Sequence, residues 1–285
     1  MAVAVVTDSS AYLPDGFASR HAVHVVPLHV LIDECSGLDG VDIGPAEVAA
    51  ALSGRRRVTT SRPNPEEFAQ IYRRLLDDGM DGIVSVHLSR ELSGTWESAR
   101  LAALEVGADR VKVVDSRTAM MGLGFSVLRA ATAAASGAGC ADVEEAAVAA
   151  AARTTTFFMV ETLEYLRRGG RIGSAAAFLG TALAVKPVLY VKDGHIVPLE
   201  KVRTTNRALA RLVDLAEQAA IDTGADEVEL AVHHLAAHER AVELATRLDE
   251  RISPSSGCVV SELGGAIGAH TGPGMLGVVV CPANG

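Results

Sequence analysis

The chain has 285 residues, of which 49% are hydrophobic and 21% are charged, so its composition excludes a disordered protein and its length suits two domains. Its net charge of −9 disfavours general binding to nucleic acid or to anionic membranes. Aromatic residues make up only 4%, so the apolar content is mainly aliphatic. This composition indicates either an alanine-rich protein or an interior with room for an aliphatic guest.

Several features bear on the compartment and on cofactors. The four cysteines form no C-x-x-C pair and no Cys/His cluster with zinc-ligand spacing, so we expect reduced thiols and no metal. The N-terminus has no basic region of a signal peptide, and acidic residues interrupt the longest apolar tract. We therefore expect a cytoplasmic protein without stable membrane insertion. The short run Arg55-Arg56-Arg57 is interpreted as a solvated loop.

The first half of the chain alternates strand and helix patterns. Apolar or β-rich runs predict strands at 3–6, 23–32, 83–87 and 111–114, with Pro27 marking an edge or a bulge in the second. Helical spacing predicts helices from 65 to about 78, at 96–106, at 122–135 and at 142–153. The first of these has a strong start, because Asn64 suits an N-cap, Pro65 suits N1 and Glu67 completes a capping box.

This alternation predicts a doubly wound parallel sheet, which binds ligands beyond the carboxyl ends of its strands. Those ends carry polar residues: Thr7, Asp8, Ser9, Ser10, Ser89, Ser93, Asp115 and Ser116.

Beyond residue 155 the pattern changes. A hairpin is predicted about Asp193-Gly194, helices at 207–220 and 239–251, and strands at 157–160, 227–232, 259–262 and 278–281. We therefore predict an α/β chain with a parallel-sheet domain at 1–155 and a smaller α+β domain with an antiparallel sheet at 156–285.

The segment 264–277 holds many glycines around His270. Glycines permit positive φ angles and close approach of the backbone to a ligand, although a mobile loop has the same composition. The histidines His233, His234 and His238 are interpreted as a surface cluster, because adjacent histidines on a strand point in opposite directions.

Hydroxyl side chains gather in the segments 59–61 and 89–95, each placed shortly before a predicted helix, and Thr271 lies beside His270. Free N–H groups and the positive end of a helix dipole, together with such hydroxyls, make a site for a carboxylate or phosphate. Serine and threonine before helices also serve simply as caps, so this pattern alone does not decide the matter.

The ordered series of motifs resembles that of the DegV family, the FakB-type fatty-acid-binding proteins of bacteria. The resemblance covers nearly the whole chain and is carried by these segments: Thr7-Asp8-Ser9-Ser10, Thr60-Ser61-Arg62-Pro63, Leu88-Ser89-Arg90-Glu91-Leu92-Ser93-Gly94-Thr95, Leu163 through Gly173, Lys186-Pro187, Lys201-Val202-Arg203-Thr204 and His270-Thr271-Gly272-Pro273-Gly274.

The resemblance implies a Rossmann-like N-terminal domain, a smaller C-terminal domain and a long-chain fatty acid in a buried tunnel. It implies that Thr60 and Ser93 bind the carboxylate, with Ser61 and His270 close by. Arg171 and Arg203 match basic positions near the head group or the partner. Arg62 replaces the glutamine usual in the family and either pairs with the carboxylate or faces the solvent.

The same resemblance implies a carrier without catalytic residues or cofactors. It would present the carboxylate to an ATP-dependent fatty acid kinase, which forms an acyl phosphate for phospholipid synthesis. The alternative is a serine-dependent acyl hydrolase or transferase in which Ser93 is the nucleophile, His270 the base and Asp115 the orienting acid. An adaptor protein without any ligand is a third possibility.

Overall fold

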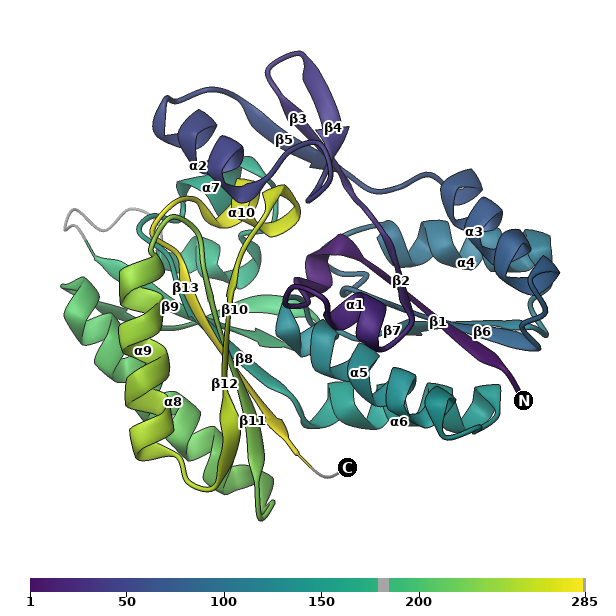
Figure 1. Ribbon diagram of the computed structural model, residues 1–285. Helices are drawn as coiled ribbons and strands as arrows, with labels where there is room; N and C mark the ends of the chain where they lie inside the picture. The colour runs from purple at the N-terminus through teal and green to yellow at the C-terminus, as the bar shows by residue number, and fades with distance from the viewer. Residues whose placement is uncertain (179–184, 284–285) are drawn as a thin grey trace.

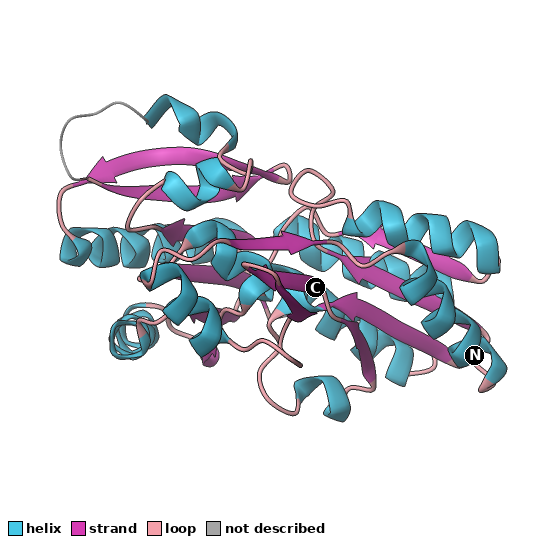
Figure 2. Cartoon of the chain, turned by 90° about the horizontal axis from the view of Figure 1, so that it is seen from above, coloured by secondary structure: helices cyan, strands magenta, loops and turns pink. Residues whose placement is uncertain are grey.

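The computed structural model describes residues 1–178 and 185–283, which form a mixed α/β fold with three sheets (Figure 1). Seen from above, the strands lie between helices on either side (Figure 2). Two large sheets carry the two halves of the chain, and a small third sheet lies near their junction.

The first sheet confirms the predicted parallel sheet. Its four strands all pair in parallel, in the order β2 (Val23–Val26), β1 (Val3–Asp8), β6 (Gly82–His87), β7 (Val111–Asp115). Two pairs of helices cover it: α3 (Pro65–Asp77) and α4 (Thr95–Val106), then α5 (Met121–Ala135) and α6 (Cys140–Arg153), on the opposite face (Figure 1). Two short elements follow β1, namely η1 (Ser9–Ala11) and α1 (Phe17–Arg20).

The start of α3 is built as its sequence indicates. The Asn64 side chain accepts a hydrogen bond from the N–H of Glu67 at 3.0 Å, and the Glu67 carboxylate accepts one from the N–H of Asn64 at 2.8 Å. Two donors that the first turn leaves without helical partners are thus satisfied.

The run 23–32 is divided at Pro27. Its first part, β2, is an edge strand of the parallel sheet, and its second part, β3 (His29–Ile32), belongs to the small antiparallel sheet of order β4 (Cys35–Leu38), β3, β5 (Val58–Ser61). Proline has no N–H to offer a ladder, which favours a break at this position. The helix α2 (Pro45–Ser53) connects β4 to β5; the sequence analysis assigned neither these two strands nor this helix.

The second large sheet has six strands. Their order is β10 (His195–Val202), β9 (Lys186–Lys192), β8 (Thr155–Met159), β13 (Leu276–Pro282), β11 (Val228–His234), β12 (Ser255–Glu262). Every pair is antiparallel, as expected, except β11 with β12, which are parallel, so the sheet is mixed. The hairpin about Asp193-Gly194 is confirmed, and both residues have the positive φ of a type I′ turn.

Helix α5 joins the two large sheets. On one side it packs against β1 and β6, and on the other against β13. Helix α8 (Thr205–Thr223) also packs against β13, with its alternate residues, and α9 (His238–Arg251) packs against β11 and β12. Every residue from Met121 to Leu128 is buried as a result. Strand β8 is the first along the chain to pair in the six-stranded sheet, near the predicted boundary at residue 155, which stays a prediction.

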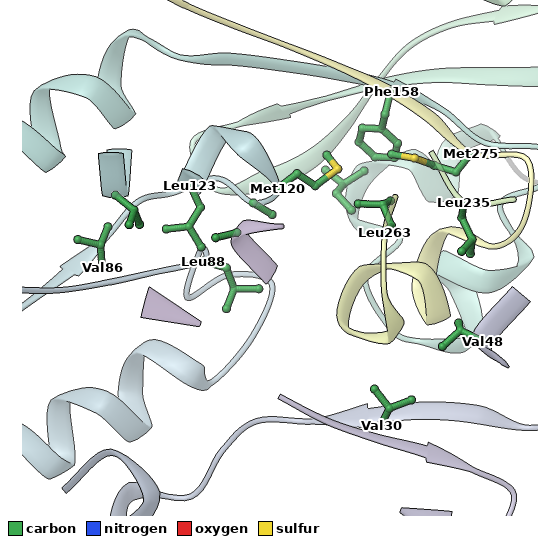
Figure 3. Close-up of a cluster of buried hydrophobic side chains, with 14 of the residues drawn as sticks. Val30, Val48, Val86, Leu88, Met120, Leu123, Phe158, Leu235, Leu263 and Met275 are labelled. Atoms are coloured by element: carbon green, nitrogen blue, oxygen red, sulfur yellow. The ribbon is translucent and has the colours of Figure 1, made fainter. Parts of the chain in front are cut away.

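A continuous apolar cluster crosses the junction. Figure 3 shows Val86, Leu88 and Leu123 from the first half near Phe158 and Met275 from the second. The same cluster includes Val30 and Val48 from the region of the small sheet.

The glycine-rich segment after residue 263 is a short helix and not a loop. Helix α10 (Gly265–Thr271) lies with α2 and α7 (Glu164–Arg168) beside the small sheet (Figure 1), and η2 (Gly173–Phe178) follows α7 in the chain. A Cβ at Gly265 would collide with Val30 on β3. This glycine therefore permits close packing of α10 on the small sheet rather than an approach to a ligand.

We predict that Asn64→Ala lowers the free energy of unfolding by about 1 kcal/mol, because the capping bond to the N–H of Glu67 is lost. Urea denaturation measures this change. Gln70→Ala on the exposed side of the same helix is the control and should change the free energy by no more than about 0.5 kcal/mol. Equal values for the two variants would contradict the capping role.

Candidate functional site

A mainly apolar cavity lies where β5, α10, the loop after β6 and β10 come together. Its apolar lining consists mainly of leucine and isoleucine: Leu28, Leu88, Leu92, Leu166, Ile196 and Ile267. The cavity volume is about 50 Å³. All the space between its lining atoms, including the part open to solvent, amounts to about 440 Å³. The cavity therefore has room for only a few waters.

Thr60 and His270 meet at the polar end of this cavity. The Thr60 hydroxyl and the His270 Nε2 are 2.8 Å apart, although the two residues are 210 positions apart in the chain. Thr60 is brought there by β5, where its neighbour on β3 is Val30, and His270 by the last turn of α10. Thr60 therefore lies within a strand that ends shortly before α3, the helix predicted to follow it.

His270 is in an environment that favours the neutral ring. Its Nδ1 is buried and, among the described residues, has no hydrogen-bond partner. Burial, and then the positive charge of Arg171, lower the pKa of His270 to about 4. A negative group entering the cavity would favour the charged ring instead.

Arg171 supplies positive charge to the same end. Its Nε donates to the carbonyl of Leu92 at 2.9 Å and its Nη1 donates to the carbonyl of Gly169. These two bonds orient a half-buried guanidinium at the cavity wall. Among the residues described as lining this cavity, Arg171 is the one with a permanent charge.

Ser93 also lines the cavity, but it has a local structural role as well. Its Oγ is 2.9 Å from the Thr95 hydroxyl and accepts a hydrogen bond from the N–H of Thr95 at 3.3 Å. The residue between them, Gly94, is the N-cap of α4. Ser93 thus accepts a hydrogen bond at the start of α4, as expected of a serine before a helix, and also lines the candidate site.

Three other residues in the predicted head-group set lie outside this cavity. Ser61 is exposed, because successive residues of a strand point to opposite faces and Thr60 takes the inner position. Arg62 is exposed and packs over Gly94, where a Cβ would collide with its guanidinium. Arg203 is exposed just before α8. No residue of this group is among those that line the cavity.

The alternative catalytic set is not assembled. The hydrogen bond of His270 goes to Thr60, and those of Ser93 go to Thr95. Asp115 accepts from the N–H of Arg117 at 2.9 Å instead of orienting the histidine. The arrangement therefore lacks the linked nucleophile, base and acid that such an enzyme requires.

A buried carboxylate that the sequence analysis did not identify holds α10 in place. Asp39 is 2% exposed; its Oδ1 accepts from the N–H of Gly265 at 2.6 Å and its Oδ2 from the Ser9 hydroxyl at 2.9 Å. Tyr12 donates its hydroxyl to Asp39 at 3.4 Å and accepts from the N–H of Ile267 at 3.0 Å. Burial raises the pKa of Asp39.

The polar residues at the end of β1 face inward and do not line the cavity. Asp8 is 2.9 Å from the Nδ1 of His87, and the Nε2 of His87 is 2.7 Å from the Ser85 hydroxyl, which accepts from Tyr72. Asp8 also accepts from the N–H of Leu88 at 3.2 Å. This buried chain of hydrogen bonds fixes the loop that begins at Leu88.

The histidines at the end of β11 are likewise largely internal. His233 and His234 are buried, which corrects the expected surface cluster. His233 accepts from the N–H of Met121 at 2.9 Å, at the start of α5. Burial, followed by the nearby His234, lowers the pKa of His233 to about 3.

Within 1–178 and 185–283, no helix is long and apolar enough to cross a membrane, and no group of three or more His, Cys, Asp and Glu residues is placed to hold a metal.

Comparison with known proteins finds relatives that match this chain over nearly its whole length. A DegV domain-containing protein of Streptomyces coelicolor is 52% identical over 278 residues, which cover 98% of each chain. The solved structure of a DegV family protein from Thermus thermophilus, described as fatty acid binding, matches with a TM-score of 0.93 at 35% identity, covering 99% of this chain and 100% of that one.

Another match is the structure of DegV from Bacillus subtilis, described as a fatty acid binding protein, with a TM-score of 0.88, 32% identity and 99% coverage of both chains. The family model described as "Uncharacterised protein, DegV family" matches residues 2–283. This protein therefore belongs to the DegV family.

Proposed function

We propose that this protein binds a long-chain fatty acid, with the carboxylate at Thr60, Ser93, His270 and Arg171 and the alkyl chain among the apolar side chains. The main support is that hydroxyls, a neutral imidazole and a guanidinium gather at one end of a cavity that is otherwise apolar. The fatty acid binding described for the relatives from Thermus thermophilus and Bacillus subtilis agrees with this chemistry.

The two ends of the ligand would contribute differently. Burying a methylene gives roughly 0.8 kcal/mol, so about 14 methylenes give on the order of 11 kcal/mol before entropic costs. A hydrogen bond to a charged group contributes about 1.5–3 kcal/mol. The alkyl chain would therefore dominate the affinity, and the polar residues would fix the orientation of the carboxylate.

The small volume of the cavity means that its walls must part for the ligand. An acyl chain of this length does not fit the space open to a few waters, so the apolar side chains have to move apart. The walls come from separate elements, including α10 and β10, so a modest displacement of one element enlarges the cavity. The open form would be the tunnel expected from the sequence.

The carrier would present the carboxylate to a separate kinase. Thr60, His270 and Arg171 line both the inner cavity and a wide groove that opens to the solvent, so a carboxylate held by them would be within reach of a partner. In this proposal an ATP-dependent fatty acid kinase transfers a phosphoryl group to that carboxylate. Arg203 and Arg62 are both exposed, and in this proposal they would contact the partner and not the carboxylate.

We expect organic extraction of the natively purified protein to yield a long-chain fatty acid at close to one molecule per chain. Mass spectrometry of the extract measures this quantity. Protein unfolded and refolded in delipidated buffer serves as the control for carry-over. Native protein without any fatty acid, and unable to take one up when it is supplied, would contradict the proposal.

We expect Ser93→Ala to reduce phosphorylation of the bound acid by the kinase more than it reduces uptake of the acid, because the alkyl chain sets affinity and the hydroxyl sets orientation. Uptake is measured with a fluorescent fatty acid and phosphorylation by acyl phosphate formation. Ser61→Ala, at an exposed serine, is the matched control and should change neither quantity. Equal losses of uptake and phosphorylation in Ser93→Ala would argue against this division.

We expect the fatty acid to raise the pKa of His270 from its value of about 4 in the free protein, because a carboxylate stabilises the imidazolium. Between the free and bound values, binding is then accompanied by proton uptake. Nuclear magnetic resonance of the imidazole nitrogens measures the titration with and without ligand. An unchanged pKa of His270 on addition of the fatty acid would place the carboxylate elsewhere.

A further inference from the structure

A groove rich in arginine adjoins the polar end of the inner cavity. Its volume is about 890 Å³, and it shares Thr60, Arg171 and His270 with the cavity. The lining includes these charged residues: Arg55, Arg56, Arg57, Arg168, Arg171 and Glu164. Five cations thus face one carboxylate, in a chain whose net charge is −9. The groove is therefore a concentrated positive region on an acidic protein.

The arginines of the groove differ in their partners. Arg56 forms an ion pair with Asp33 at 2.6 Å, and Arg168 forms one with Glu164 at 2.7 Å. Arg55 and Arg57 have no carboxylate partner within the described part of the chain, and Arg171 donates only to backbone carbonyls there. The guanidinium groups of Arg55 and Arg57 are consequently available for an anion even when Arg171 binds the fatty acid carboxylate.

The backbone holds the arginine run in a defined shape. The N–H of Arg55 and the N–H of Arg56 donate to carbonyls of the last turn of α2, at 3.0 and 2.9 Å. The N–H of Arg57 donates to the Asp33 carboxylate at 3.0 Å, and Arg55 has a positive φ of 58°. The run is thus a tight turn fixed at three successive residues, and the interpretation as a plain solvated loop is incomplete.

These features favour a phosphorylated small molecule. Guanidinium groups bind phosphate oxygens in a bidentate manner, and the groove volume falls within the roughly 300–1,000 Å³ typical of small-molecule sites. One phosphate group does not fill such a groove, and two available arginines suit a ligand with more than one phosphate. We propose that the groove binds an organic anion with two or more phosphate groups, of the size of a nucleotide or coenzyme, beside the acyl-binding cavity.

This site goes beyond the proposed function and can be tested independently of it. Isothermal titration calorimetry of the full chain with ATP, coenzyme A and inorganic pyrophosphate measures binding, and the three probes separate recognition of the phosphates from recognition of the organic part. We expect saturable binding of at least one probe. We expect Arg55→Gln/Arg57→Gln to weaken it by roughly 100-fold, since each lost charge-assisted contact weakens binding about tenfold.

The matched control is Arg74→Gln/Arg207→Gln, which removes two exposed arginines outside the groove and gives the same net charge. It should bind the probe as the unaltered protein does, and both variants should contain as much fatty acid as that protein. Absence of saturable binding by all three probes would overturn the proposal. So would equal weakening in the two double variants, because that result would indicate general electrostatic attraction. Fatty acid content measured in the same samples reports separately on the acyl site.

Discussion

The candidate site depends on the buried carboxylate of Asp39. It binds the first N–H of α10 and the Ser9 hydroxyl together, so it ties the glycine-rich helix to the end of β1. Because α10 carries His270 and Ile267 into the cavity wall, the position of this one carboxylate sets the geometry of the polar end. A carboxylate at a helix N-terminus is favourable, and burial without these donors would be costly. The helix, the strand end and the acid are therefore stable only as a unit.

The large elements follow from sequence patterns. The buried strands β1 and β6 are continuous apolar runs, and α3 has both a capping box and a regular apolar face, so local preference and tertiary packing agree. The resemblance to the DegV family then predicted Thr60, Ser93 and His270, which the fold brings to one cavity. Long-range pairs such as Thr60 with His270 leave no periodic signal in the sequence, so the residue patterns alone did not join them.

The elements that the sequence did not reveal have weak local patterns. Strand β4, Cys-Ser-Gly-Leu, has little β preference of its own and is held by pairing with β3. Helix α10 contains glycines that disfavour a helix, and it forms because Asp39 and Tyr12 satisfy its first N–H groups while its small residues allow close packing on Val30. The sequence patterns did not predict the groove either. The run 55–57 is charged, and its neighbours in space, Arg168 and Arg171, are far along the chain.

The small volume of the inner cavity would limit the rate at which a ligand enters and leaves. When a guest must wait for packed walls to separate, the time that it spends inside is set by the frequency of that opening rather than by diffusion alone. Leucine and isoleucine from several elements would re-close behind it. A protein of this kind would exchange its ligand slowly in free solution. Any encounter that displaces α10 would speed both binding and release of the ligand. The fraction of protein that holds a fatty acid would then depend more on earlier encounters of this kind than on the current concentration of free fatty acid.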